Sequence, residues 1–111
     1  MHTSQARKAD IFRALHRRPG CFVVANAWDA GTARILASLG FEALATTSAG
    51  LAFSMGRCDG GGEISPEETL ENARQIVEAT DLPVSADLEN GWSVDPRDVA
   101  EIIRRAAAVG L

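Results

Sequence analysis

The sequence predicts an α/β protein built on a parallel sheet, and three observations support this fold class. Three short apolar runs, none alternating cleanly between apolar and polar residues, each precede a segment with helical spacing. Continuous runs of this length are typical of strands buried on both faces, as in parallel sheets. Strand and helix also alternate along the chain, which favours right-handed crossover connections. Finally, 111 residues with 46% hydrophobic and 23% charged side chains match the composition of one globular domain.

Each predicted strand is a short, largely apolar run followed by a loop. The three strands are expected at residues 21–25, 43–47 and 82–86. A leading helix is expected over residues 9–17, with Ile11, Phe12 and Leu15 on its inward face. Pro19 and its neighbours then interrupt the helix before the first strand.

The helices between the strands are marked by caps and stop signals. Gly40 follows the helical spacing after the first strand and ends that helix. Ser65, Pro66 and Glu68 form the pattern of a capping box with proline at the first helical position. Asp95 precedes another proline and opens the last helix in a similar way.

The connection between the second strand and its helix, residues 48–65, is unusually long. Long loops inside compact domains are usually functional. The three consecutive glycines at residues 60–62 predict a mobile segment within this connection. We therefore expect the connection to close over a bound ligand.

The number of strands is small for the predicted fold class. Three parallel strands leave two open edges, and a (β/α)8 barrel takes about 250 residues. The chain also stops after a helix, at Gly110 and Leu111, where another strand would begin. We expect residues 1–111 to be the N-terminal part of a single barrel-sized domain whose remainder lies outside this chain.

Composition excludes several classes of protein. A net charge of -4 argues against nucleic acid as a partner. No apolar run approaches the roughly 20 residues that span a bilayer, and residues 1–8 lack the apolar core of a secretory signal. Two cysteines, Cys21 and Cys58, do not make a disulfide framework. The expected location is the cytoplasm, with no membrane contact.

Acidic residues follow all three predicted strands, where chemistry collects in α/β folds. These acids are Asp29, Asp59, Asp87 and Glu89. Asp87 and Glu89 are two apart, so an extended backbone would point both side chains the same way. Oxygen ligands without a histidine or cysteine cluster favour Mg2+. The alternative interpretation, helix caps and solvated loop charges, has about equal weight.

Small residues end the second strand. Thr47, Ser48, Ala49 and Gly50 would allow backbone N–H groups to approach a carboxylate or phosphate. A plain tight turn is the alternative interpretation of the same four residues.

Three segments, residues 26–34, 46–51 and 86–91, together resemble the isocitrate lyase/phosphoenolpyruvate mutase superfamily. The similarity extends over nearly the whole chain and includes phosphoenolpyruvate phosphonomutase and 2-methylisocitrate lyase relatives. It implies the first three β/α units of a (β/α)8 TIM-type barrel with parallel strands and a leading helix. The chain would then be an N-terminal fragment.

The resemblance also implies an activity. Members are Mg2+-dependent lyases or mutases, with Mn2+ as a substitute ion, that act on small α-oxo or α-hydroxy carboxylates. They break or form a C–C or P–C bond through a pyruvate enolate. A carbon–carbon lyase is favoured over a mutase, the chain alone is expected to be inactive, and a homo-oligomer is expected at full length.

Site residues follow from the same resemblance. Asp87 corresponds to the direct metal ligand, and Asp59 and Glu89 correspond to acids that hold metal-bound water; these three are the candidate catalytic residues. The segment that binds the substrate carboxylate corresponds to Thr47, Ser48 and Ala49.

Two other interpretations of the sequence stay open. One is a non-catalytic half barrel that binds a carboxylate or pairs with another subunit. The other is a complete small α/β binding domain of flavodoxin-like type, although neither a phosphate-binding glycine loop nor a receiver-like acidic cluster fits the spacing.

Overall fold

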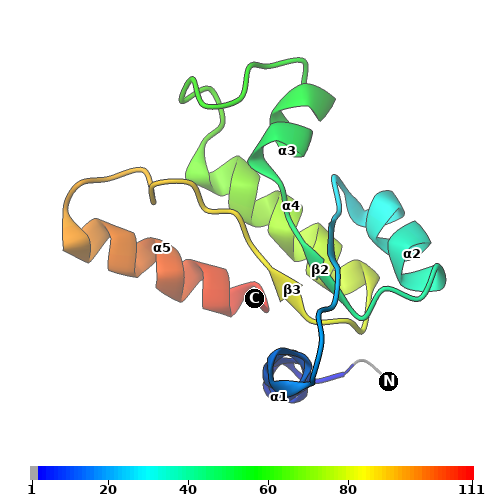
Figure 1. Cartoon of the computed structure of the whole chain (residues 1–111). Coiled ribbons are helices and arrows are strands. Elements are labelled where there is room, and N and C mark those ends of the chain that lie inside the picture. The colour runs from blue at the N-terminus through cyan, green and yellow to red at the C-terminus, as the bar shows by residue number, and fades with distance from the viewer. Residues whose placement is uncertain (1–2) are drawn as a thin grey trace.

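The computed structural model describes residues 3–111, and Met1 and His2 lie outside the described part. Helices and strands alternate in the predicted order, with one additional helix (Figure 1). The elements are α1 (Gln5–Arg17), β1 (Val24–Asn26), α2 (Ala30–Ser38), β2 (Ala43–Ala45), α3 (Ser48–Ser54), α4 (Pro66–Ala79), β3 (Val84–Ser85) and α5 (Pro96–Ala108).

The three strands form one parallel sheet in the order β1-β2-β3. Val24 pairs with Ala43, and Leu44 pairs with Val84. The predicted α/β class with parallel strands is therefore confirmed. Each strand is shorter than predicted, and the predicted start of the first strand is exposed, with Val23 65% accessible.

The core lies between the sheet and the helices α2 and α4, which pack against each other (Figure 1). Leu44 of β2 and Ile76 of α4 are fully buried, and Ala27 and Ala33 complete the cluster. Leu44 lies in the central strand, which explains why it is fully buried while β1 is only partly buried.

Helix α1 lies at the end of the sheet where the strands begin (Figure 1). It starts four residues earlier than predicted, because the Ser4 side chain accepts a hydrogen bond from the Arg7 N–H and caps the helix. Lys8 is 8% exposed and its Nζ donates to the Thr80 carbonyl at 2.8 Å, which ties α1 to the end of α4. The prediction of an inward Ile11 is wrong, since this side chain is 37% exposed.

The predicted 48–65 loop is wrong in its first half, where α3 forms. Thr47 caps α3 by accepting the Gly50 N–H. The helix is stabilised by apolar burial, because Leu51 and Ala52 pack with Ile64 in a second cluster. The irregular connection is thus residues 55–65.

No helix within residues 3–111 combines the length and the apolar character needed to cross a bilayer.

Candidate functional site

Thr46 joins the carboxyl ends of β2 and β3. Its N–H donates to the Ser85 carbonyl at 3.0 Å, and its Oγ1 accepts the Asp87 N–H at 3.0 Å. Thr46 is only 5% exposed, so both of its polar groups need such partners. These two contacts fix the backbone of Asp87 directly against the end of the neighbouring strand.

The Asp87 carboxylate accepts two backbone N–H groups. Oδ1 accepts the Glu89 N–H at 3.0 Å, and Oδ2 accepts the Ser48 N–H at 3.3 Å. These donors, the Glu89 N–H above all, hold the pKa of Asp87 below its ordinary value of 3.8 against the opposing effect of partial burial. The structure therefore places an ionised carboxylate beside the segment predicted to bind the substrate carboxylate.

The backbone after Asp87 turns rather than continuing as a strand. Glu89 has φ of 47°, in the left-handed region, and its N–H bonds back to the Asp87 side chain as in an Asx turn. The extended backbone from which Asp87 and Glu89 were expected to point the same way is therefore not present. The turn decides the direction of the Glu89 side chain.

Glu89 lines a pocket of about 450 Å3 between two long loops, the 55–65 connection and residues 86–95 after β3. The other lining residues are Gly60, Gly62, Asn90 and Trp92. Gly91, with φ of 75°, follows Asn90, and a Cβ at that position would lie 3.1 Å from both methyl carbons of Val99. Glycine thus allows this loop to approach α5 closely.

The segment at the start of α3 is a helix cap rather than a plain tight turn. Thr47 uses its Oγ1 to accept the Gly50 N–H at 3.2 Å, and Ser48 contacts Asp87 as described above. Gly50 has a steric role, because a Cβ there would lie 2.6 Å from Trp28 Cδ1. The Trp28 ring therefore packs directly over the backbone that begins α3.

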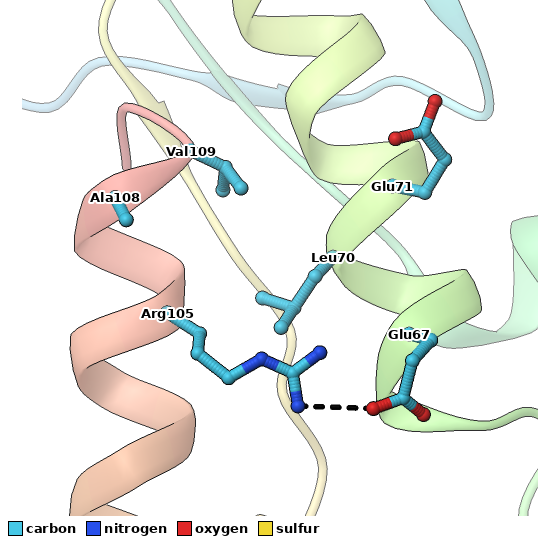
Figure 2. Close-up of a pocket in the computed structure, with 6 residues that line it drawn as sticks. All are labelled: Glu67, Leu70, Glu71, Arg105, Ala108 and Val109. Carbon is cyan, nitrogen blue, oxygen red and sulfur yellow. Dashed lines mark hydrogen bonds and ion pairs between the residues drawn. The ribbon is translucent and has the colours of Figure 1, made fainter.

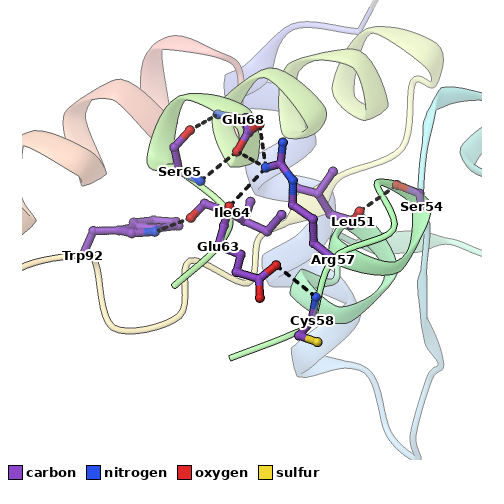
Figure 3. Close-up of polar contacts among 9 residues, drawn as sticks. All are labelled: Leu51, Ser54, Arg57, Cys58, Glu63, Ile64, Ser65, Glu68 and Trp92. Carbon is purple, nitrogen blue, oxygen red and sulfur yellow. Dashed lines mark hydrogen bonds and ion pairs between the residues drawn. The ribbon is translucent and has the colours of Figure 1, made fainter. Parts of the chain in front are cut away.

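The base of the 55–65 connection is held by polar contacts (Figure 3). Arg57 pairs with Glu68 at 2.8 Å and donates to the Glu63 carbonyl at 3.1 Å. Glu68 also completes the predicted capping box with Ser65, and the Ser65 N–H, followed by Arg57, lowers its pKa. Residues 59–62, which we call the tip, lie between these contacts and include Asp59.

Asp29 has a structural role at the start of α2. Its Oδ1 accepts both the Thr32 N–H and the Thr32 hydroxyl at 2.7 Å. These bonds lower the pKa of Asp29, with the backbone N–H as the largest cause. For this acid, the alternative interpretation as a helix cap is confirmed.

Among residues 3–111, no three His, Cys, Asp or Glu side chains lie close enough together to hold a metal ion. The structure brings Asp87 to Ser48 and links it to Glu89 through the turn, whereas Asp59 sits exposed on the tip. The available donors are carboxylate oxygens, which suit Mg2+ with retained waters. The metal roles of Asp59, Asp87 and Glu89 stay predictions.

Two contributing residues were missed in the sequence. Thr46 belongs to a predicted strand and to the 46–51 segment but was given no site role, although a polar residue that ends a buried run needs a hydrogen-bond partner. Trp92 donates its Nε1 hydrogen to the Ile64 carbonyl at 3.1 Å and so joins the two long loops (Figure 3). No local sequence pattern predicts this contact between Trp92 and Ile64.

A parallel sheet with a fixed carboxylate at its strand ends is the arrangement of α/β enzymes that carry out chemistry there. Comparison with known proteins makes the class specific. The phosphoenolpyruvate phosphomutase family matches residues 12–111, and the chain belongs to this family.

Individual relatives agree with that assignment. A 2-methylisocitrate lyase of Halalkalibacterium halodurans is 33% identical over 89 residues, which are 80% of this chain and 29% of that protein. The crystal structure of 2,3-dimethylmalate lyase, a PEP mutase/isocitrate lyase superfamily member, is 31% identical with a TM-score of 0.81, over 94% of this chain and 37% of that one. A phosphoenolpyruvate phosphomutase of Streptomyces platensis subsp. rosaceus is 28% identical with a TM-score of 0.86, over 93% of this chain and 35% of that one.

The predicted superfamily is thus confirmed, and its members include both lyases and mutases. The structural relatives are TIM-barrel enzymes, which agrees with the prediction that this chain forms the first β/α units of such a barrel. The chain spans between 29% and 38% of the length of the curated relatives that it matches.

Proposed function

We propose that the protein carrying this chain is a Mg2+-dependent lyase that cleaves a carbon–carbon bond in a small α-oxo or α-hydroxy carboxylate. The observation that carries the proposal is the ionised Asp87 carboxylate held against the Ser48 N–H at the ends of two parallel strands. Relatives named 2-methylisocitrate lyase and 2,3-dimethylmalate lyase support lyase chemistry. A 40% identical putative phosphonomutase from Burkholderia cenocepacia J2315 supports the mutase alternative, and the turnover assay below separates the two.

The donor set supports Mg2+, with Mn2+ as a substitute. Asp87 would bind the ion directly, and Asp59 and Glu89 would hold it through water. When bound, the ion supplies Lewis-acid stabilisation of the negative charge that develops on the substrate oxygens, worth several kcal/mol. Thr46 supports this role by holding the Asp87 backbone at the sheet edge.

Thr47, Ser48 and Ala49 would bind the carboxylate of the substrate. The Ser48 N–H already faces a carboxylate oxygen, since it donates to Asp87 at 3.3 Å. For this N–H to bind the substrate carboxylate, the Asp87 oxygen would have to give up the bond as it turns to the ion, and the backbone donor would then stabilise the substrate anion from a fixed position. The tip carries three glycines and would exclude water from the bound substrate by closing over it.

A second candidate function is a non-catalytic module that pairs with another subunit. A groove of about 320 Å3 between α4 and α5 supports it (Figure 2). Leu70 and Val109 give the groove an apolar floor, and Arg105 pairs across it with Glu67 at 3.0 Å. None of the candidate site residues lines this groove. A homo-oligomer at the protein's full natural length is compatible with either function.

Substrate turnover distinguishes the two functions. The protein at its full natural length is assayed with oxaloacetate, an alkyl-substituted isocitrate and phosphonopyruvate, each with Mg2+ and with excess chelator. The expected result is chelator-sensitive cleavage of a C–C bond, followed by the release of an oxo acid. Conversion of phosphonopyruvate alone would make the protein a mutase or a P–C lyase. Failure to bind Mg2+ or to turn over any of the three would favour the non-catalytic module.

A further inference from the structure

Trp92 lies at the meeting point of the two long loops. Its indole N–H donates to the Ile64 carbonyl at 3.1 Å, a contact that we call the Trp92–Ile64 bridge (Figure 3). Within residues 3–111, this is the only hydrogen bond between residues 55–65 and residues 86–95. It therefore provides the direct polar connection between the loop that follows β3 and the 55–65 connection, at a residue just past the tip.

The Ile64 end of the bridge is firmly held. The Ile64 side chain is 9% exposed and packs with Leu51 and Ala52 of α3. Ser65, the next residue, caps α4. The Ile64 side chain is therefore held against α3, whereas its backbone carbonyl, two residues after the last glycine of the tip, accepts its hydrogen bond from Trp92.

The Trp92 end adopts an unusual backbone. Trp92 has φ of 57°, a left-handed conformation that costs energy for a residue with a side chain. Its N–H donates to Asn90 Oδ1 at 2.9 Å, which supports that conformation. Such a backbone persists where surrounding contacts stabilise it, and it turns the indole toward Ile64.

The bridge borders the pocket in which the two loops face each other. Glu89 and Trp92 line the pocket from the loop after β3, and Gly60 and Gly62 line it from the tip. The Arg57–Glu68 ion pair holds the other side of the connection. Between these two held sides, the Cys58 N–H donates to Glu63 Oε2 at 3.4 Å, and the tip with Asp59 lies between those two residues.

We propose that Trp92 is a positioning residue whose bridge to Ile64 sets how closely the tip, and with it Asp59, approaches Asp87 and Glu89. The inference rests on the proposed metal role of these acids and adds a residue to it. Loss of the bridge would let the tip sample open positions, so Asp59 would reach the metal less often. A purely structural tryptophan would affect stability and leave this approach unchanged.

The first test measures the rate of proteolysis beside the tip, in the ligand-free protein at its full natural length. Trp92→Phe keeps an aromatic ring and removes the N–H donor. A glutamate-specific protease should cleave after Glu63 about fivefold faster in this variant, because one ordinary hydrogen bond is lost and cleavage follows the open population. Cleavage after Glu42, in the loop before β2, is the internal control and should not change. Trp28→Phe, which removes the other tryptophan, should leave cleavage after Glu63 unchanged.

The second test is a double-mutant cycle on Mg2+ binding in the protein at its full natural length. Trp92→Phe should weaken Mg2+ binding about fivefold in the parent and cause no further loss when Asp59→Asn is already present. Equal cleavage after Glu63 in parent and variant would overturn the bridge. The same fivefold loss in both backgrounds would overturn the coupling to Asp59.

Two further measurements keep the test decisive. If Trp92→Phe does not fold, Trp92→Met also removes the indole donor and should raise cleavage after Glu63 by a similar factor; unchanged cleavage in that variant would overturn the bridge. The proposed function fails separately, through an Asp87→Asn variant that retains normal Mg2+ affinity. The protease result contains no metal and is independent of that outcome.

Discussion

Asp87→Asn changes one atom of the side chain and removes its charge, and the structure indicates what each loss should do. The carboxylate accepts the Glu89 N–H at 3.0 Å and the Ser48 N–H at 3.3 Å. An amide has one oxygen, so it can satisfy only one of these donors in the present geometry. The shorter Glu89 bond should be kept, which leaves the Ser48 N–H facing the amide nitrogen.

The expected magnitudes separate folding from metal binding. Loss of the long Ser48 bond should lower the free energy of unfolding by about 1 kcal/mol, or roughly 2–4 °C in a domain of barrel size. Removing an outer partner of a metal ligand already costs about 10–100-fold in affinity. Removing the direct ligand should therefore weaken Mg2+ binding by at least about 100-fold, or ~2.7 kcal/mol. The expected loss of Mg2+ binding free energy therefore exceeds the expected loss of unfolding free energy.

Titration calorimetry with Mg2+ and thermal melts without metal measure the two effects in the protein at its full natural length. Asp29→Asn is the matched control, because Asp29 also accepts backbone and hydroxyl donors but caps α2, where asparagine serves equally well. This control should keep its Mg2+ affinity and nearly all of its stability. Near-normal turnover with intact Mg2+ affinity in Asp87→Asn would refute the assignment of Asp87 as the ligand.

Three further perturbations follow from the contacts around the site. Thr46→Val keeps the side-chain shape but removes the acceptor of the Asp87 N–H, so it should lower the free energy of unfolding by about 1–3 kcal/mol. Chemical denaturation measures this loss, and an unchanged midpoint would contradict the role of the bond. Gly50→Ala would place a Cβ 2.6 Å from Trp28 Cδ1, so it should cost about 1–3 kcal/mol and shift tryptophan fluorescence, and a silent variant would argue against this close packing. The capping N–H and the neighbouring guanidinium lower the pKa of Glu68 below 4.5, so its stabilising contribution is complete above pH 4.5 and is lost as the pH falls through the lowered value. The difference in unfolding free energy between the parent and Glu68→Gln should therefore shrink below pH 4.5, and a constant difference would exclude the linkage.

Local sequence patterns correctly predicted those structural features that depend only on residues close together in the chain. The capping box at Ser65 and the cap at Asp95 were predicted correctly, because each needs only contacts within one helical turn. The parallel α/β class followed from the alternation of predicted strands and helices, and the burial of Leu44 in β2 against Ile76 in α4 agrees with it. Short motifs at three strand ends were enough to identify the superfamily.

Packing between distant segments decided the details of the site. The α3 helix was mistaken for a loop, because Leu51 is stabilised by burial against Ile64 rather than by a strong local signal. Asp87 meets Thr46 and Ser48 across 41 and 39 positions of sequence, and its side chain turns the chain at Glu89. Such contacts depend on which strands are neighbours and on where their ends meet. Residue spacing predicts that acids gather at one edge of the sheet, whereas the direction of each side chain is set by hydrogen bonds that form only after the strands have paired.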